Sequence, residues 1–206
     1  MYDEGYIKYQ YDWIEAPARG WHKIRALSEW RQLMFEAGLI GAYDGEIGFG
    51  NISIRDTPAK EFIITGATTG NLKNLGPEHF TRVIDYDFGA NHLTCKGPIR
   101  ASSESLTHAA VYEASRAINA VIHIHNADMW HKYKDVLPTT SPEIPYGTPD
   151  MAFEVNRLVR ESVRPAKQLI IMGGHEEGVL AYGDSLGKAA SVLLNCCDRM
   201  FRPGAS

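Results

Sequence analysis

The segment "SSESLTHAAVYEASRAINAVIHIH", residues 102–125, joins two local patterns that together decide the fold class. Its first part, 102–117, predicts a helix, because the hydroxyl and carboxyl side chains at its start can cap exposed amides ahead of an alanine-rich run. Its second part, 119–125, predicts a strand, because short β-branched runs are typical of strands. A helix that leads directly into a strand indicates a domain in which helices cover a sheet.

The segments on either side continue this alternation. Residues 22–38 carry apolar side chains near helical spacing, which predicts a helix with Gly38 as its C-cap. We expect Asp184 to be the N-cap of the last helix. The predicted helices are 22–38, 102–117, 148–162 and 185–201, and the predicted strands are 50–55, 60–65, 81–88, 119–125, 167–172 and 178–183. This order predicts an α/β or α+β fold with a helix-covered sheet.

Length and composition describe one ordinary globular domain, which we expect to span residues 1–206. A chain of 206 residues is large enough for a core of its own. The charged share of 22% and the net charge of -4 leave no basic stripe for nucleic acid. The sequence starts without a basic region followed by an apolar one, and it contains no run of about 18 apolar residues. We therefore expect a cytoplasmic protein with no nucleic-acid or membrane partner.

Two histidines near the end of the predicted strand suit a shared metal ion. Side chains two residues apart in a strand leave the same face, so His123 and His125 can point at one atom. A catalytic zinc site usually takes three protein ligands and leaves one position for water or substrate. The candidate third ligand is His175, which follows two glycines in "MGGHEEG". An H-x-H pair is also typical of a polar strand face, and the pair alone leaves both interpretations open.

The start of the helix before this strand offers a carboxylate. Glu104 follows Ser102 and Ser103, and a carboxylate in a first turn can simply stabilise the positive end of a helix. A Glu that lies beside a metal ion without binding it can instead move a proton next to a polarised carbonyl. The helix pattern alone leaves both roles open.

Taken together, four segments resemble the class II aldolase/adducin family. They are "GNISIR", "ASSESLTHAAVYEA", "VIHIH" and "GGHEEGVLAYG", in this order, and the resemblance runs from the first helix to the last. It implies a three-layer α/β/α sandwich with a mainly antiparallel central sheet. It also implies a homo-oligomer, a tetramer with active sites at the subunit interfaces.

The resemblance also implies roles for the histidines and the carboxylate. His123, His125 and His175 would hold Zn²⁺ or another divalent ion such as Mn²⁺, and Glu104 would be the acid/base residue. We therefore expect a metal-dependent lyase of the aldolase type that acts on a small sugar or sugar phosphate through a zinc-stabilised enediolate.

Family members that handle phosphate imply an anion-binding cradle of hydroxyls and loop amides. The positions that match it here are Asn51, Ser53, Thr69, Gly70, Ser102 and Ser103. The turn "ITGATTGNLKNL" is longer than the usual one, so Thr65 and Thr68 remain alternatives. A cluster of Gly and Thr is equally typical of a plain loop.

The chain also departs from the family pattern. Glu176 and Glu177 follow His175 where a glycine is common, and they could orient the imidazole or face solvent. Tyr146, in "EIPYGTPDM", is our candidate for a proton donor acting across a subunit interface, or it is a structural turn residue. His108 shares a helix face with Glu104 and could reach the site.

Three other functions and one further segment complete these expectations. An epimerase or dehydratase of a ketose phosphate would use the same zinc site. A non-catalytic adducin-like module typically lacks the histidines, and an amidohydrolase barrel needs roughly 250 residues. We expect residues 1–20 to form an N-terminal arm in which Tyr9, Tyr11 and Trp13 alternate. One face of an edge strand, or an arm laid on a neighbouring subunit, would bury such rings, and we favour packing at an interface.

Overall fold

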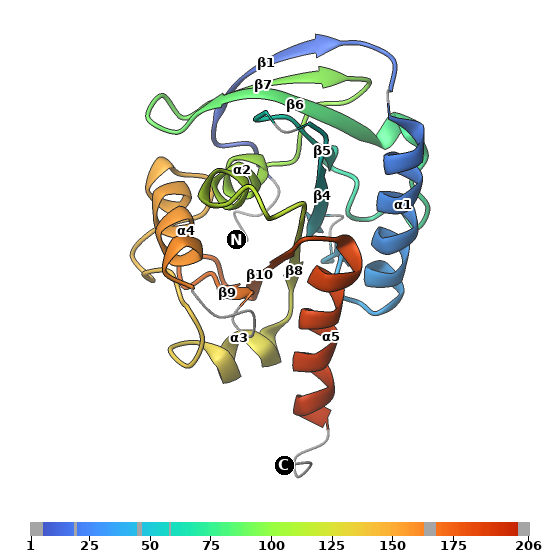
Figure 1. The fold of residues 1–206 in the computed structure, drawn as a ribbon. Coiled ribbons are helices and arrows are strands. Elements are labelled where there is room, and N and C mark those ends of the chain that lie inside the picture. Colours follow the sequence, from blue (N-terminus) through green and yellow to red (C-terminus); the bar gives the residue numbers. More distant parts are fainter. Residues whose placement is uncertain (1–5, 19, 45–46, 58, 163–167, 202–206) are drawn as a thin grey trace.

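The computed structural model describes residues 6–18, 20–44, 47–57, 59–162 and 168–201. The strands are β1 (Gln10–Glu15), β2 (Gly41–Ala42), β3 (Gly48–Phe49), β4 (Asn51–Arg55), β5 (Phe62–Thr65), β6 (Phe80–Asp87), β7 (His92–Gly97), β8 (Ala120–His125), β9 (Leu169–Ile171) and β10 (Gly178–Gly183). The helices are α1 (Trp21–Glu36), α2 (Ser105–Ala114), α3 (Ala127–Tyr133), α4 (Pro149–Glu161) and α5 (Leu186–Phe201), with a short 3₁₀ helix, η1 (Pro77–His79). Figure 1 shows their arrangement.

The main sheet has eight strands in the order β1-β7-β6-β5-β4-β8-β10-β9 and is mixed. Strand β1 pairs with β7 in parallel, whereas the other neighbouring strands of this sheet pair antiparallel. The expected mainly antiparallel sheet is therefore corrected to a mixed one. Two parallel strands cannot be joined by a hairpin and need a longer connection. Here the chain forms α1 and strands β2 to β6 between β1 and β7. The sequence patterns predicted no strand at β7, and for the segment of β1 they offered an edge strand only as one of two alternatives, so this pairing was not anticipated.

Helices cover the sheet on both faces, which explains why β8 is buried along its whole length. Helices α2 and α4 lie on one side of β8 and α1 and α5 on the other (Figure 1). Val121 packs in the hydrophobic cluster that contains α2 and α4, and Ile122 and Ile124 pack in the cluster that contains α1 and α5. His123 alternates with these isoleucines and therefore faces the α2 side.

The path from α2 to β8 positions the site. Helix α2 begins at Ser105, later than the predicted start at 102, because Glu104 occupies its N-cap position. A short connection reverses the chain into β8, so the start of α2 and the end of β8 lie at the same end of the fold. Asn126 then begins α3, where its side-chain oxygen accepts a hydrogen bond from Met129 N at 2.8 Å.

Two predicted caps shift by one residue. The C-cap of α1 is Ala37, and Gly38 follows it with φ of 70°, a left-handed conformation that favours glycine. At α5 the residue before the helix is Ser185, whose hydroxyl accepts from Lys188 N at 3.3 Å, rather than Asp184. Across the described part of the chain, none of the helices combines the length and apolar character needed to cross a membrane.

Candidate metal centre and adjoining pocket

Three buried histidines converge at the end of β8. His123 and His125 come from β8, and His175 comes from the loop between β9 and β10. One ligand nitrogen from each lies within 4.8 Å of the others, and each side chain is at most 3% exposed. Three imidazole nitrogens at this separation can bind one divalent ion. The structure thus brings together the three histidines that the sequence nominated.

Two glycines allow the third histidine to reach the cluster. A Cβ added to Gly173 would lie 2.1 Å from the carbonyl oxygen of Thr140, and one added to Gly174 would lie 1.8 Å from that of Ile144. Neither contact is tolerable, so side chains at these positions would displace the loop. The close packing that glycine permits therefore holds His175 against the end of β8.

The electrostatics of the cluster favour neutral imidazoles. Burial lowers the pKa of His123 well below its usual value, and the neighbouring His125 and His175 lower it further. Burial, followed by the charge of His175, lowers the pKa of His125 in the same way. Neutral imidazole is the form that binds metals. Within the described residues His123 Nε2 is buried without a hydrogen-bond partner, which fits a nitrogen that faces an ion.

Glu104 is buried, and its side chain does not cap the helix. It is 2% exposed and makes no side-chain capping bond at the start of α2. Its Oε2 instead accepts a hydrogen bond from the hydroxyl of Thr107 at 2.8 Å. The capping interpretation of this carboxylate is therefore not supported, and a buried carboxylate needs another reason to be there.

The register of α2 along β4 shows where this carboxylate lies. Arg55 donates to backbone carbonyls at the C-terminal end of α2, and Ser53, two residues earlier, lies 2.7 Å from His108 Nδ1 through its hydroxyl. Two residues along a strand and one turn along a helix both cover about 5–7 Å. One helical turn before His108 is Glu104, and two strand residues before Ser53 is Asn51, so Glu104 lies opposite Asn51. Asn51 is the strand partner of the first histidine of the cluster. Glu104 therefore belongs to the end of α2 that faces the metal centre.

A pocket of about 450 Å³ adjoins the cluster. Of the six positions expected to bind an anion, it is lined by Asn51, Thr69, Gly70, Ser102 and Ser103, and the alternative Thr68 lines it too. Asn51 links the two sites, because its Nδ2 lies 3.4 Å from the Nδ1 of His123. Phe49 also lines the pocket and stacks on the ring of His125.

Two of the nominated hydroxyls point elsewhere. The Ser53 hydroxyl is fully buried and lies 2.8 Å from the Tyr112 hydroxyl as well as near His108, so it supports the packing of α2 on β4. The hydroxyl of Thr65 accepts from Ile52 N at 3.3 Å. Neither residue is part of the pocket lining.

A buried arginine, which the sequence did not single out, holds the pocket turn. Arg31 of α1 is 1% exposed, and its Nη2 donates to the carbonyl oxygens of Thr69 and Gly70, each at 2.9 Å. Its Nη1 donates to the carbonyls of Leu72 and Lys73. Burial lowers the Arg31 pKa to about 10, so the guanidinium keeps its charge at neutral pH. The turn is thus fixed by a cation directly behind it.

Arg100 is a second cation that the sequence analysis missed. It lines the pocket together with Ser102, and it donates a hydrogen bond to the Tyr11 hydroxyl at 3.0 Å. Its position two residues before the Ser-Ser-Glu run was the signal available in the sequence. The positive charge of Arg100 at the pocket suits an anionic ligand.

Tyr146 reaches the metal centre through His175. The two rings stack with centroids 4.4 Å apart, and the ammonium of Lys8 lies 3.7 Å from the Tyr146 ring centroid. Tyr146 is 6% exposed. The structure therefore places this turn tyrosine beside the histidines of its own chain, whereas the sequence analysis nominated it as a donor to a site across a subunit interface.

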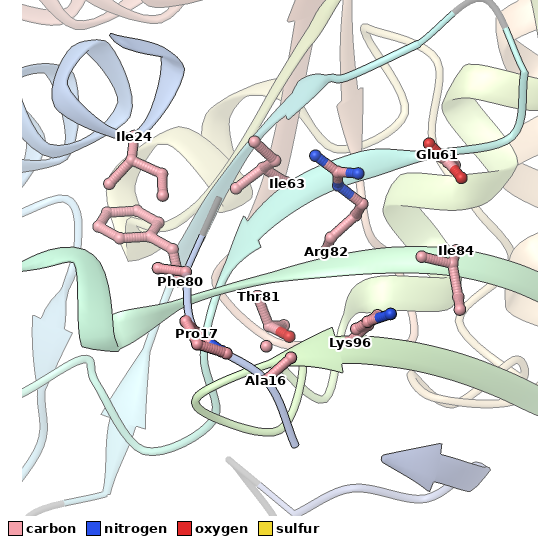
Figure 2. A pocket seen from close by; sticks show the side chains of 12 residues that line it. Ala16, Pro17, Ile24, Glu61, Ile63, Phe80, Thr81, Arg82, Ile84 and Lys96 are labelled. Atoms are coloured by element: carbon pink, nitrogen blue, oxygen red, sulfur yellow. The ribbon is translucent and has the colours of Figure 1, made fainter. Parts of the chain in front are cut away.

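A second pocket lies away from these residues. Figure 2 shows this cavity of about 230 Å³, with Phe80 and Ile24 at one end and Arg82 and Lys96 further along. Arg82 is engaged in an ion pair with Asp56 at 2.6 Å. None of the nominated site residues lines this cavity, so it is not the candidate site.

Comparisons with known proteins agree with this arrangement. The family model of the Class II Aldolase and Adducin N-terminal domain matches residues 26–201, a range that contains the three histidines and Glu104. No curated protein matches the sequence significantly.

Solved structures are similar to this chain at low sequence identity. YgbL from Escherichia coli, whose name offers aldolase, epimerase and decarboxylase as alternatives, is 17% identical with a TM-score of 0.64, covering 88% of this chain and 90% of its own. An L-fuculose 1-phosphate aldolase is 16% identical with a TM-score of 0.63, covering 89% and 87%. A sugar-phosphate aldolase from Thermotoga maritima is 16% identical with a TM-score of 0.61, covering 88% and 94%. These likenesses establish the class II aldolase-like fold.

Proposed function

Because the chain belongs to the family of class II aldolase and adducin N-terminal domains, we propose that it is a metal-dependent lyase of the aldolase type. Its substrate would be a small sugar or sugar phosphate with a carbonyl group. The observation that carries this proposal is the convergence of three buried histidines, His123, His125 and His175. A module that serves only protein contacts has no evident use for three buried imidazoles around one point.

The histidines fit a divalent ion, and we propose Zn²⁺. Imidazole nitrogen suits zinc, and three protein ligands are typical of catalytic zinc sites. When bound, the ion would withdraw charge from a substrate carbonyl and so make the neighbouring C–H more acidic. Burial of the cluster strengthens electrostatic interactions by excluding water.

Glu104 would act as the acid/base residue. Its carboxylate lies at the end of α2 that faces the cluster, and Thr107 holds one of its oxygens. From there it would give a proton to the carbon beside the substrate carbonyl after the carbon–carbon bond has broken, and it would take that proton when an aldol forms. Dehydration would use the same carboxylate to remove a proton from that carbon before the hydroxyl group leaves.

The adjoining pocket would hold the anionic end of the substrate. Hydroxyls and backbone amides from the turn 68–70 and from Ser102 and Ser103 would surround a phosphate, with Asn51 between pocket and cluster. Arg31 and Arg100 add the positive charge that a doubly negative group requires. This supports a phosphorylated sugar over an uncharged one.

Tyr146 would supply the second proton. Its ring stacks on His175, and its hydroxyl would donate a proton to the aldehyde oxygen when an aldol forms and take that proton back when the carbon–carbon bond is cleaved.

We also propose a three-layer α/β/α arrangement and a homotetramer. Two hydrophobic clusters on opposite faces of the sheet support the layers. The half-exposed rings of Tyr11 and Trp13 on the edge strand β1 support an interface there.

The first test is metal content, followed by a substrate screen. We expect about one divalent ion per chain in the purified wild type and almost none in His125→Ala, because two ligands bind far more weakly than three. The control is His131→Ala, which alters an exposed histidine on α3 and should leave the metal content unchanged. The metal-loaded wild type is then assayed for aldehyde release from ketose and aldose phosphates.

The possible results separate the alternatives. Aldehyde release that requires the metal supports the lyase. Turnover of a sugar phosphate without carbon–carbon cleavage would retain the metal centre and replace the lyase by an epimerase or dehydratase. Wild-type protein that takes up no ion from excess Zn²⁺ or Mn²⁺ would refute the metal centre and leave a binding module.

A further inference from the structure

A tyrosine hydroxyl connects the second histidine of the cluster to a carboxylate. Tyr43, in the segment after β2, donates a hydrogen bond to Glu177 Oε2 at 2.5 Å. The same hydroxyl lies 2.8 Å from the Nδ1 of His125. The three residues come from separate parts of the chain: the end of β2, the loop before β10 and the end of β8.

The direction of these bonds determines the tautomer of His125. A phenol carries one proton, and a carboxylate can only accept, so the Tyr43 proton is directed to Glu177. The phenol oxygen is then an acceptor, and His125 Nδ1 must be the donor. With the proton on Nδ1, the lone pair of the imidazole is on Nε2. Nε2 is then the nitrogen that can bind a metal.

The aromatic packing around Tyr43 keeps its hydroxyl in place. Its ring lies 4.6 Å from that of Phe49, centroid to centroid, and the Phe49 ring stacks on His125 at 5.4 Å. Tyr43 and His125 rings meet edge-on at 6.0 Å. The hydroxyl is therefore held by ring contacts on both sides of the hydrogen bond.

Glu177 adopts a backbone conformation that its side chain disfavours. Its φ is 64°, in the left-handed region that glycine adopts without strain. Its carbonyl oxygen accepts from Asn126 N at 2.9 Å, which ties this loop to the residue directly after β8. Glycine would adopt this conformation without strain. We therefore attribute the presence of glutamate to the hydrogen bond that its carboxylate accepts from Tyr43.

The neighbouring Glu176 does not take part. It is exposed, whereas Glu177 is partly buried. Of the two acidic residues that follow His175, one therefore faces solvent and the other contacts the histidine on the adjacent strand through Tyr43. The two carboxylates thus form a matched pair for an experiment.

We propose that Tyr43 and Glu177 are positioning residues of the metal centre that hold His125 as the Nδ1–H tautomer and strengthen its bond to a divalent ion. A hydrogen bond from the distal nitrogen towards a carboxylate fixes the ring and makes the ligating nitrogen more basic. Here a tyrosine hydroxyl relays that effect. The inference rests on the metal centre of the proposed function.

The first test compares the affinity of Zn²⁺ for the wild type and for Tyr43→Phe, measured by competition with a chromophoric chelator. Removing such an outer partner typically weakens metal binding on the order of 10–100-fold, and we expect a loss in this range. Glu176→Ala is the control, with affinity within about twofold of the wild type, since its carboxylate faces solvent.

A second pair of variants separates positioning from structural support. Glu177→Ala and Glu177→Gly both remove the carboxylate, but only the glycine variant relieves the left-handed backbone. We expect both to weaken Zn²⁺ binding about equally, whereas the metal-free melting temperature should be higher for Glu177→Gly than for Glu177→Ala. A purely structural role would make affinity follow the melting temperature.

Each outcome is decisive. If Tyr43→Phe and both Glu177 variants bind Zn²⁺ as tightly as the wild type, the positioning role of Tyr43 and Glu177 is wrong, but the metal centre is retained. Wild type that binds no Zn²⁺ overturns the metal centre and the relay together. Selective weakening in these variants, with Glu176→Ala unchanged, supports the inference.

Discussion

At the scale of single residues, the site depends on a carboxylate buried without a capping role. Glu104→Gln keeps the shape of the side chain and an oxygen for the Thr107 hydroxyl, but it cannot accept a proton from substrate. We expect the turnover rate to fall about 10²–10⁴-fold, as is typical for loss of a general acid or base. Metal content and melting temperature should stay close to the wild type.

The control for this change is Glu143→Gln, which alters an exposed carboxylate in the loop before α4. Turnover and metal content are measured for both variants on the substrate found in the screen. Full activity in Glu104→Gln would remove this residue from the reaction. Loss of the metal along with activity would instead make it a ligand.

Short sequence patterns nominated the histidines of the cluster, but they did not nominate the residues that hold the site in place. H-x-H spacing and the double glycine nominated the histidines, because strand alternation and the steric freedom of glycine act locally. Tyr43 and Arg31 could not be found in this way. Tyr43 donates a hydrogen bond to Glu177, and Arg31 donates to backbone carbonyls of the pocket turn. These partners are distant in the sequence, so no local pattern of side chains predicts the contacts.

At the scale of elements, helix α1 contacts the turn that lines the pocket through the side chain of Arg31. Arg31→Met would leave the four carbonyls of the turn without their donor, and it would remove the charge behind the pocket. We expect inorganic phosphate to bind about tenfold more weakly, which corresponds to about 1.4 kcal/mol. Zn²⁺ affinity should change little, because the turn does not supply the histidines.

The matched control is Arg25→Met on the same helix. Arg25 is exposed and pairs with Glu29 at 3.0 Å, an i,i+4 surface contact of small energy. Calorimetric titration with phosphate measures both variants. Equal phosphate affinities in Arg31→Met and Arg25→Met would show that the pocket turn needs no cation behind it.

The elements that could be predicted are those with a buried face. The first helix emerged from apolar periodicity, the helix before β8 from its capping residues, and the strands from short β-branched runs. Strand β1 exposes its residues along its whole length, so the alternation of Tyr11 and Trp13 within it did not mark a core strand. Strand β7 does alternate buried and more exposed residues over its six positions, a signal that the sequence analysis missed, whereas α3 has seven residues, too few for a clear helical period.

At the scale of the whole molecule, β1 ends the sheet and leaves one row of backbone groups without a strand partner in the described part of the chain. Open edges pair readily with another chain unless they are covered. Tyr11 and Trp13 are 39% and 40% exposed on this strand, and large half-exposed rings at an edge are typical of interfaces. Both features favour an interface with another copy of this chain at β1.

Trp13→Lys tests the interface, because a charge at a buried contact opposes association. We expect the wild type to sediment as a tetramer and Trp13→Lys as a species of half that mass or less. Val136→Lys is the control, since Val136 is 69% exposed in the loop between α3 and α4, which pairs with β9 at the opposite edge of the sheet from β1. Sedimentation velocity at several concentrations measures all three proteins. A tetramer that persists in Trp13→Lys would move the interface away from β1, and a monomeric wild type would mean that one chain holds a complete site.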